Sequence, residues 1–164
     1  MTIRDKDRGF RKVVKALLGA GRKPPVVTVG IHAAEGGQAH KPPKRKKPIK
    51  GEHAQALTIG AIAEKNEFGR GVRARSFVVA YADAAKADIE AQERNLAQGV
   101  AKGKIDRDQY GELFGLFAVG GMQRRISDGI PPPNEKSTIL RKGSSTPLID
   151  TGQLRSSIRH KVKQ

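Results

Sequence analysis

Three consecutive prolines, Pro131 to Pro133, place the strongest local constraint on this chain. Each proline ring fixes its own φ and biases the preceding residue toward extended geometry, so a helix that precedes them must end near Gly129. The next helix start signal is Asp150, whose carboxylate can cap a first turn while Gln153 reaches back. Residues 129–149 show little apolar periodicity between these boundaries. We therefore expect an extended Pro-rich arm over these residues. A connection of that length is usually either functional or disordered.

The charge balance indicates which partners the chain favours, and its cysteine count limits its chemistry. The 164 residues include 32 Lys and Arg against 16 Asp and Glu, a formal net charge of +16, which favours nucleic acid or an acidic protein surface as a partner. No cysteine is present, so there is no disulfide framework and no thiolate ligand or nucleophile. No apolar run is long enough to span a bilayer, and the basic N-terminal segment is too polar for a signal peptide. We expect a soluble protein with no membrane partner.

Apolar periodicity predicts helices and strands in a mixed order. The expected helices cover 5–19, 58–68, 76–97 and 106–129, and the expected strands cover 26–31 and 158–162. The two long helices are separated by a short break, which predicts an αα-hairpin. The expected fold class is α+β, with a small antiparallel or mixed β-sheet packed against this hairpin. A chain of this length is expected to form one domain over 1–164.

Polar residues at the helix ends support these boundaries. Thr58 can cap the short helix, and Gly69 suits its left-handed end. Ser76 is a candidate cap for the long Ala-rich helix. Asp106 and Gln109 have the spacing of a capping box, in which each side chain bonds the other residue's backbone N–H.

A second irregular stretch is the basic flexible loop expected at 33–56. Its basic residues are Lys41, Lys44, Arg45, Lys46, Lys47 and Lys50. Such a run is usually a solvated loop, and contact with DNA phosphates or with an acidic protein partner stays open as an alternative. Three histidines, His32, His40 and His53, flank the loop at a spacing too wide to indicate a metal site.

The usual sequence signatures of catalysis are missing. The serines at 144, 145, 156 and 157 stand in turn or cap contexts without a nucleophile-elbow pattern. Neither a P-loop nor a dinucleotide-binding glycine pattern occurs, and the carboxylates are dispersed. We therefore expect a protein that is not an enzyme and that has no catalytic, cofactor-binding or metal-binding residues.

Two stretches of the sequence carry a family resemblance. The C-terminal one comprises Ile130, Pro131, Asn134, Thr138, Lys142, Gly143, Pro147, Leu148, Asp150, Thr151, Gly152, Leu154, Ser157 and Ile158. The upstream one comprises Ile62, Ala63, Asn66, Glu67, Phe68, Gly69, Arg75, Ser76 and Phe77, after a strand-like Val29, Gly30 and Ile31. Together they resemble the tail-completion or neck (head–tail joining) proteins of tailed bacteriophages. Ser76 stands where proline is common in that family, and the basic insertion from Lys41 to Lys50 has no counterpart.

The resemblance implies a structural virion protein of the head–tail junction, made in the host cytoplasm. It implies a homo-oligomeric ring, expected to be a hexamer, that surrounds the DNA passage. The implied partners are head-completion or connector proteins and tail terminator or tail tube proteins, with non-specific DNA contact in addition. The alternative is a basic nucleic-acid-binding protein that uses the loop at 41–50.

Three groups of residues have expected roles: the resemblance implies the first, the cap pattern predicts the second, and the basic charge of the loop suggests the third. The expected subunit-interface arm comprises Ile130, Pro131, Pro132, Pro133, Asn134, Thr138, Lys142, Pro147 and Leu148. The expected helix cap comprises Asp150, Thr151 and Gln153. The expected contacts with DNA or an acidic partner are the six basic residues of the loop named above.

Overall fold

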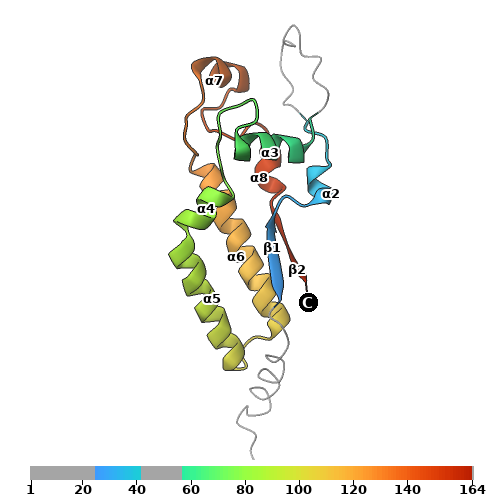
Figure 1. Cartoon of the computed structure of the whole chain (residues 1–164), viewed down its shortest axis with the longest axis vertical. Coiled ribbons are helices and arrows are strands. Elements are labelled where there is room, and N and C mark those ends of the chain that lie inside the picture. The colour runs from blue at the N-terminus through green and yellow to red at the C-terminus, as the bar shows by residue number, and fades with distance from the viewer. Residues whose placement is uncertain (1–24, 42–56, 164) are drawn as a thin grey trace, which may run out of the picture. The chain divides into compact units, whose positions relative to one another are not determined.

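The computed structural model describes residues 25–41 and 57–163 of the chain (Figure 1). Two of the sequence-based predictions, the helix at 5–19 and most of the basic loop, lie outside these residues. The elements in chain order are β1 Val26–Gly30, α2 Ala33–Gly36, α3 Ile59–Phe68, α4 Val79–Ala84, α5 Lys86–Ala101, α6 Arg107–Ser127, α7 Lys136–Lys142, α8 Gln153–Ser156 and β2 Arg159–Lys163.

The fold class is α+β, as predicted: β1 and β2 pair in an antiparallel two-stranded sheet that packs against helices. The described residues group into two compact units. The first contains 25–28, 86–118 and 160–163, and the second contains 29–41, 57–85 and 119–159. The single domain expected from the chain length stays a prediction.

In the first unit, β2 packs on α6 at two glycines. Gly111 faces the side chain of Val162, and Gly115 faces the ring of His160, so closely that a Cβ at either glycine would overlap its neighbour. The imidazole Nε2 of His160 lies 2.8 Å from Oε2 of Glu112 on the same helix face. The glycines therefore let the strand approach the helix backbone closely.

The turn between α5 and α6 follows the sequence prediction. The backbone N–H of Gln109 donates to Oδ1 of Asp106 at 2.8 Å, and the N–H of Asp106 donates to Oε1 of Gln109 at 2.9 Å. This reciprocal pair is the predicted capping box, and it begins α6. Gly99 on α5 faces the side chain of Ile105, which brings the turn back onto the helix that precedes it.

The second unit has the larger buried core. Its fully buried side chains include Phe77, Ile59, Ile126 and Ile158. Tyr81 of α4 is buried against Gly121 of α6, where a Cβ would overlap the phenol ring. Helix α3 contacts both α2 and α8 (Figure 1). The contact with α2 is made backbone to backbone, because Gly36 and Gly60 face each other there.

Three sequence-based predictions are wrong in detail. The expected helix at 76–97 is two helices, α4 and α5, separated at Ala85, and the boundary between the two units falls at the same point. The expected extended arm at 129–149 contains a helix, α7, which ends in a left-handed Gly143. Residues 33–36 of the expected flexible loop form the helical turn α2.

Other boundaries are confirmed. Thr58 caps α3 by accepting a hydrogen bond from the N–H of Ala61 at 3.2 Å, and Gly69 ends that helix in the left-handed conformation. The strands predicted at 26–31 and 158–162 are β1 and β2 within one residue. Among the helices of the described residues, none is long and apolar enough to cross a membrane.

Candidate functional site

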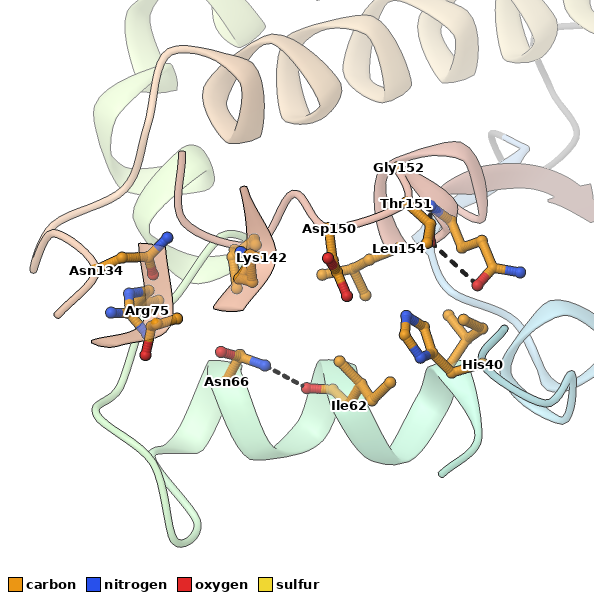
Figure 2. Close-up of a pocket in the computed structure, with 14 residues that line it drawn as sticks. His40, Ile62, Asn66, Arg75, Asn134, Lys142, Asp150, Thr151, Gly152 and Leu154 are labelled. Carbon is orange, nitrogen blue, oxygen red and sulfur yellow. Dashed lines mark hydrogen bonds between the residues drawn. The ribbon is translucent and has the colours of Figure 1, made fainter. Parts of the chain in front are cut away.

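The candidate site is a hollow of about 270 Å³ in the second unit (Figure 2). Helix α3 forms one side, and the segment that leads into α8 forms the other (Figure 2). The lining residues are His40, Ile59, Ile62, Asn66, Arg75, Asn134, Thr138, Lys142, Leu148, Asp150, Thr151, Gly152, Gln153 and Leu154. The hollow thus collects side chains from five separate parts of the sequence.

The apolar part of the lining comes from four aliphatic side chains. Ile59 and Ile62 lie one turn apart on α3, and Leu148 and Leu154 come from the opposite segment. Ile59 and Leu154 are also buried in the core, so this part of the lining is held in place by packing. Leu148 is a non-glycine residue with φ of 61°, a left-handed conformation that costs free energy and that the surrounding contacts must maintain.

Arg75 fixes one end of the hollow. Its Nε donates to the carbonyl oxygen of Pro132 at 2.9 Å, and its Nη2 donates to that of Pro133 at 3.2 Å. Its own backbone N–H donates to the carbonyl oxygen of Asn66 at 2.7 Å. A single residue therefore joins the end of α3 to the Pro-rich arm, with the paired donors that a guanidinium offers in a fixed geometry.

The arm after the prolines closes on itself. Nδ2 of Asn134 donates to the carbonyl oxygen of Ser145 at 3.1 Å, and Nζ of Lys142 donates to that of Thr146 at 3.3 Å. Pro147, in the same stretch, is buried. These contacts hold α7 and the residues that follow it as an ordered lobe.

The other end of the hollow is formed by His40, Thr151 and Gln153. Oε1 of Gln153 accepts a hydrogen bond from the backbone N–H of Lys41 at 2.9 Å, and it also accepts one from the Thr151 hydroxyl at 3.2 Å. Helix α8 begins at Gln153, and its N-cap is Gly152, which makes no side-chain cap hydrogen bond. The helix predicted to begin at about Asp150 therefore begins three residues later, and Oε1 of Gln153 bonds the chain at Lys41. Thr151, also predicted as part of the cap, accepts a hydrogen bond from the N–H of Gln153 at 3.5 Å.

Glu67 links the end of α3 to the start of α4. In the sequence it was interpreted only as part of a helix end. The carboxylate of Glu67, on α3, accepts hydrogen bonds from the Ser76 hydroxyl at 2.7 Å and from the backbone N–H groups of Phe77, Val78 and Val79 at 2.8 to 3.1 Å. These N–H groups precede or begin α4, so Glu67 caps the start of that helix. Ser76, the predicted cap, contributes as well, because its hydroxyl accepts from the N–H of Ala80, the second residue of α4, at 3.2 Å.

The same contacts lower the pKa of the Glu67 carboxyl group. Partial burial raises the pKa of its carboxyl group, but the hydrogen bonds from Ser76 and from the N–H groups of Val78, Val79 and Phe77 favour the charged form and lower the pKa below its ordinary value of 4.5. Glu67 is therefore ionised in the folded protein at neutral pH. The spacing of Glu67 from Ser76 was visible in the sequence, but nothing local indicated that α3 and α4 would meet there.

The predicted arm residues differ in their exposure. Ile130 and Pro147 are buried in the chain's own second unit, whereas Pro131 and Pro133 are exposed. The remaining ones are half-buried, and four of the nine, Asn134, Thr138, Lys142 and Leu148, line the hollow. Of the predicted basic contacts, Lys41 is exposed, and Lys44, Arg45, Lys46, Lys47 and Lys50 lie outside the described residues.

The hollow has an aliphatic part and a polar rim. Its rim holds the cations of Arg75 and Lys142 and the carboxylate of Asp150. Within the part of the chain that the structure describes, no group of three or more His, Cys, Asp or Glu side chains is placed to hold a metal ion. Comparison of the chain with protein-family models, curated proteins and solved structures finds no significant match.

Proposed function

We propose that this protein is a structural subunit of a bacteriophage head–tail junction, and that it acts by assembling into a ring around the DNA passage. The proposal starts from the resemblance of its two sequence stretches to tail-completion or neck proteins. One observation supports it: the residues of the two stretches meet around one hollow. Ile62, Asn66 and Arg75 come from the upstream stretch, and most of the other lining residues come from the C-terminal stretch.

A hydrogen bond also links the two stretches directly. Nε of Arg75, in the upstream stretch, donates to the carbonyl oxygen of Pro132, which lies between matched residues of the C-terminal stretch 57 positions later. The two stretches are therefore packed together in the second unit. The ordered arm, with exposed Pro131 and Pro133, offers a neighbouring subunit a surface that has little conformational freedom to lose on binding.

The decisive test is genetic and structural. In a phage that encodes this chain, deletion of its gene should leave filled or empty heads and separate tails, which electron microscopy counts directly. Expression of the chain from a plasmid should restore joined particles, and a tagged copy should label the junction. Joined, infectious particles at the normal yield without the chain would overturn the proposal.

A second function is favoured by the net charge of +16 and by the basic run from Lys41 to Lys50. On this view the chain binds nucleic acid through phosphate contacts, with an affinity that falls steeply as salt rises. The two functions are compatible, because a ring around DNA can also contact it. Direct measurement of DNA binding distinguishes a chain that binds DNA alone from one that does so only within the assembly.

A further inference from the structure

An aromatic side chain stands exposed on the second unit. Phe68, the last residue of α3, has 67% of its surface exposed. The guanidinium of Arg70 lies over its ring, with Cζ 5.8 Å from the ring centroid, and an ion pair with Glu64 holds Arg70 in turn. Gly69 and Gly71, both with positive φ, form the tight turn that makes this stacking geometry reachable. The exposed ring therefore has a guanidinium stacked beside it on the protein surface.

The same helix carries the hollow on a different side. At 100° per residue, Phe68 points roughly opposite to the face that Ile59, Ile62 and Asn66 present to the hollow. Phe68 therefore cannot enter the hollow of its own chain. A side chain that projects on one side of α3 and a hollow on its other side allow identical copies to contact one another. Such a contact repeats in one direction from copy to copy.

The hollow is large enough for this ring, and part of its lining is aliphatic. A cavity of roughly 150 Å³ lined by aliphatic groups accommodates benzene, and this hollow measures about 270 Å³ with Ile59, Ile62, Leu148 and Leu154 among its lining. The rim carries charges of both signs, and Asp150, beside the cations Arg75 and Lys142, is its group of opposite charge to Arg70. Buried aromatic anchors with an adjacent Arg are also the composition found at the energetic centres of protein interfaces.

We propose that Phe68 of one copy inserts into this hollow of the next copy, with Arg70 reaching the rim at Asp150. The contact is heterologous, since different surfaces of the two copies meet, and a heterologous contact generates a ring when its rotation closes. The inference rests on the proposed ring function and specifies which surfaces form that ring. Leu140, on α7, is more exposed still at 86%, but its side chain is aliphatic and carries no aromatic ring.

Two classes of variant test the contact in the full-length chain. Phe68→Asp removes the inserted ring, and Leu140→Asp is its control, because both residues are exposed and lie in the same unit. Thr138→Trp fills the hollow, and Ser137→Trp is its control, one residue earlier on α7 and outside the lining. Thr151→Trp, at the other end of the hollow, is a second filling variant in case Thr138→Trp does not fold by circular dichroism.

Analytical ultracentrifugation and native mass spectrometry measure the self-association of each chain. We expect the wild-type chain to self-associate and both control variants to match it. Phe68→Asp and the filling variant should each weaken association by roughly thirtyfold or more. An equimolar mixture of Phe68→Asp with the filling variant forms a dimer and stops there. One intact projecting ring and one intact hollow remain in that mixture, and they form a single contact.

Three outcomes would overturn the contact: a wild-type chain that stays monomeric at all concentrations, a Phe68→Asp chain that associates like wild type, or a mixture that stays monomeric. The proposed function is judged separately, in the phage. Phe68→Asp particles that join heads to tails at the normal yield reject the contact and leave the ring function standing. A wild-type chain that associates through Phe68 while its deletion leaves head–tail joining intact rejects the function and leaves the contact standing.

Discussion

The guanidinium of Arg75 donates a hydrogen bond of 2.9 Å to the carbonyl oxygen of Pro132, a residue 57 positions further along the chain. A second bond of 3.2 Å reaches Pro133, so two successive carbonyl groups of the Pro-rich arm are held by one side chain. Proline has no N–H, and the arm can therefore form few backbone ladders of its own. Its carbonyl groups must find donors elsewhere, and Arg75 is the donor that the fold supplies.

Replacing Arg75 by lysine should destabilise the protein while keeping the charge. A lysine ammonium cannot reproduce the two fixed N–H directions, so we expect the free energy of unfolding to fall by about 1–2 kcal/mol. Urea-induced unfolding followed by circular dichroism measures the change. Arg73→Lys is the control, because the Arg73–Glu135 ion pair of 3.1 Å is exposed and worth less than about 1 kcal/mol. Equal effects of the two substitutions would contradict the structural role of Arg75.

Glu67 should make stability depend on pH in a defined range. Its carboxyl pKa is lowered in the folded protein, so its contribution is fully present above the ordinary value of 4.5 and is lost as the pH falls through the lower folded value. Glu67→Gln should cost about 1–3 kcal/mol at neutral pH and should flatten this acid dependence. Urea unfolding at a series of pH values from neutral to acid checks both effects. Glu64→Gln, which loses only an exposed ion pair with Arg70, should keep the acid dependence of the wild type.

Adjacent glycines of α6 should respond oppositely to alanine. A Cβ at Gly121 overlaps the ring of Tyr81, which is buried and has little room to move, so Gly121→Ala should lower the free energy of unfolding by about 1–3 kcal/mol. A Cβ at Gly120 meets open space within the described structure. Gly120→Ala should therefore raise stability by up to about 1 kcal/mol through helix propensity. Thermal unfolding of both variants gives the signs directly, and destabilisation by Gly120→Ala would show that this face of α6 is covered.

The basic run should account for DNA binding if the chain binds DNA. Replacing Lys44, Arg45, Lys46 and Lys47 by alanine removes four positive charges, so the slope of log affinity against log salt should become shallower by about three to four. Fluorescence anisotropy with a labelled duplex of mixed sequence, over a range of salt concentrations, measures the slope. Replacing four lysines and arginines outside the run, Lys86, Arg94, Lys102 and Lys104, is the charge-matched control. Unchanged affinity at low salt in the loop variant would remove the support for the nucleic-acid alternative.

Local signals predicted the parts of the fold that local chemistry decides. The capping box of Asp106 and Gln109, the cap at Thr58 and the left-handed end at Gly69 all involve residues within a few positions of one another. Such contacts form in any context that allows a helix, so the sequence pattern is sufficient to predict them. The alternation of apolar and polar residues that predicted β2 likewise needs only one covered face of the strand. That face packs on the glycines of α6.

Two predictions failed, one at Gln153 and one at Ala85. Asp150 and Gln153 have the spacing of a capping box as well, but Gln153 instead accepts the N–H of Lys41, 112 residues away in sequence. Ala-rich sequence around Ala85 favours an unbroken helix, yet α4 ends at Ala84 and α5 begins at Lys86. The partner of Gln153 is distant in the chain and leaves no local sign of itself, so no cap rule could have predicted that outcome.

By itself the sequence determined where helices and strands can start and stop, the α+β class, the basic character of the chain and the two stretches that carry the family resemblance. Only the tertiary structure decided that those stretches meet, with Arg75 as the joining residue and a hollow between α3 and the segment before α8. The reason is that propensities and caps act over a few residues, whereas a hollow exists only once distant backbone segments are held together. The Pro-rich arm is ordered by its partners elsewhere in the chain, and its prolines alone specify only that it cannot continue a helix.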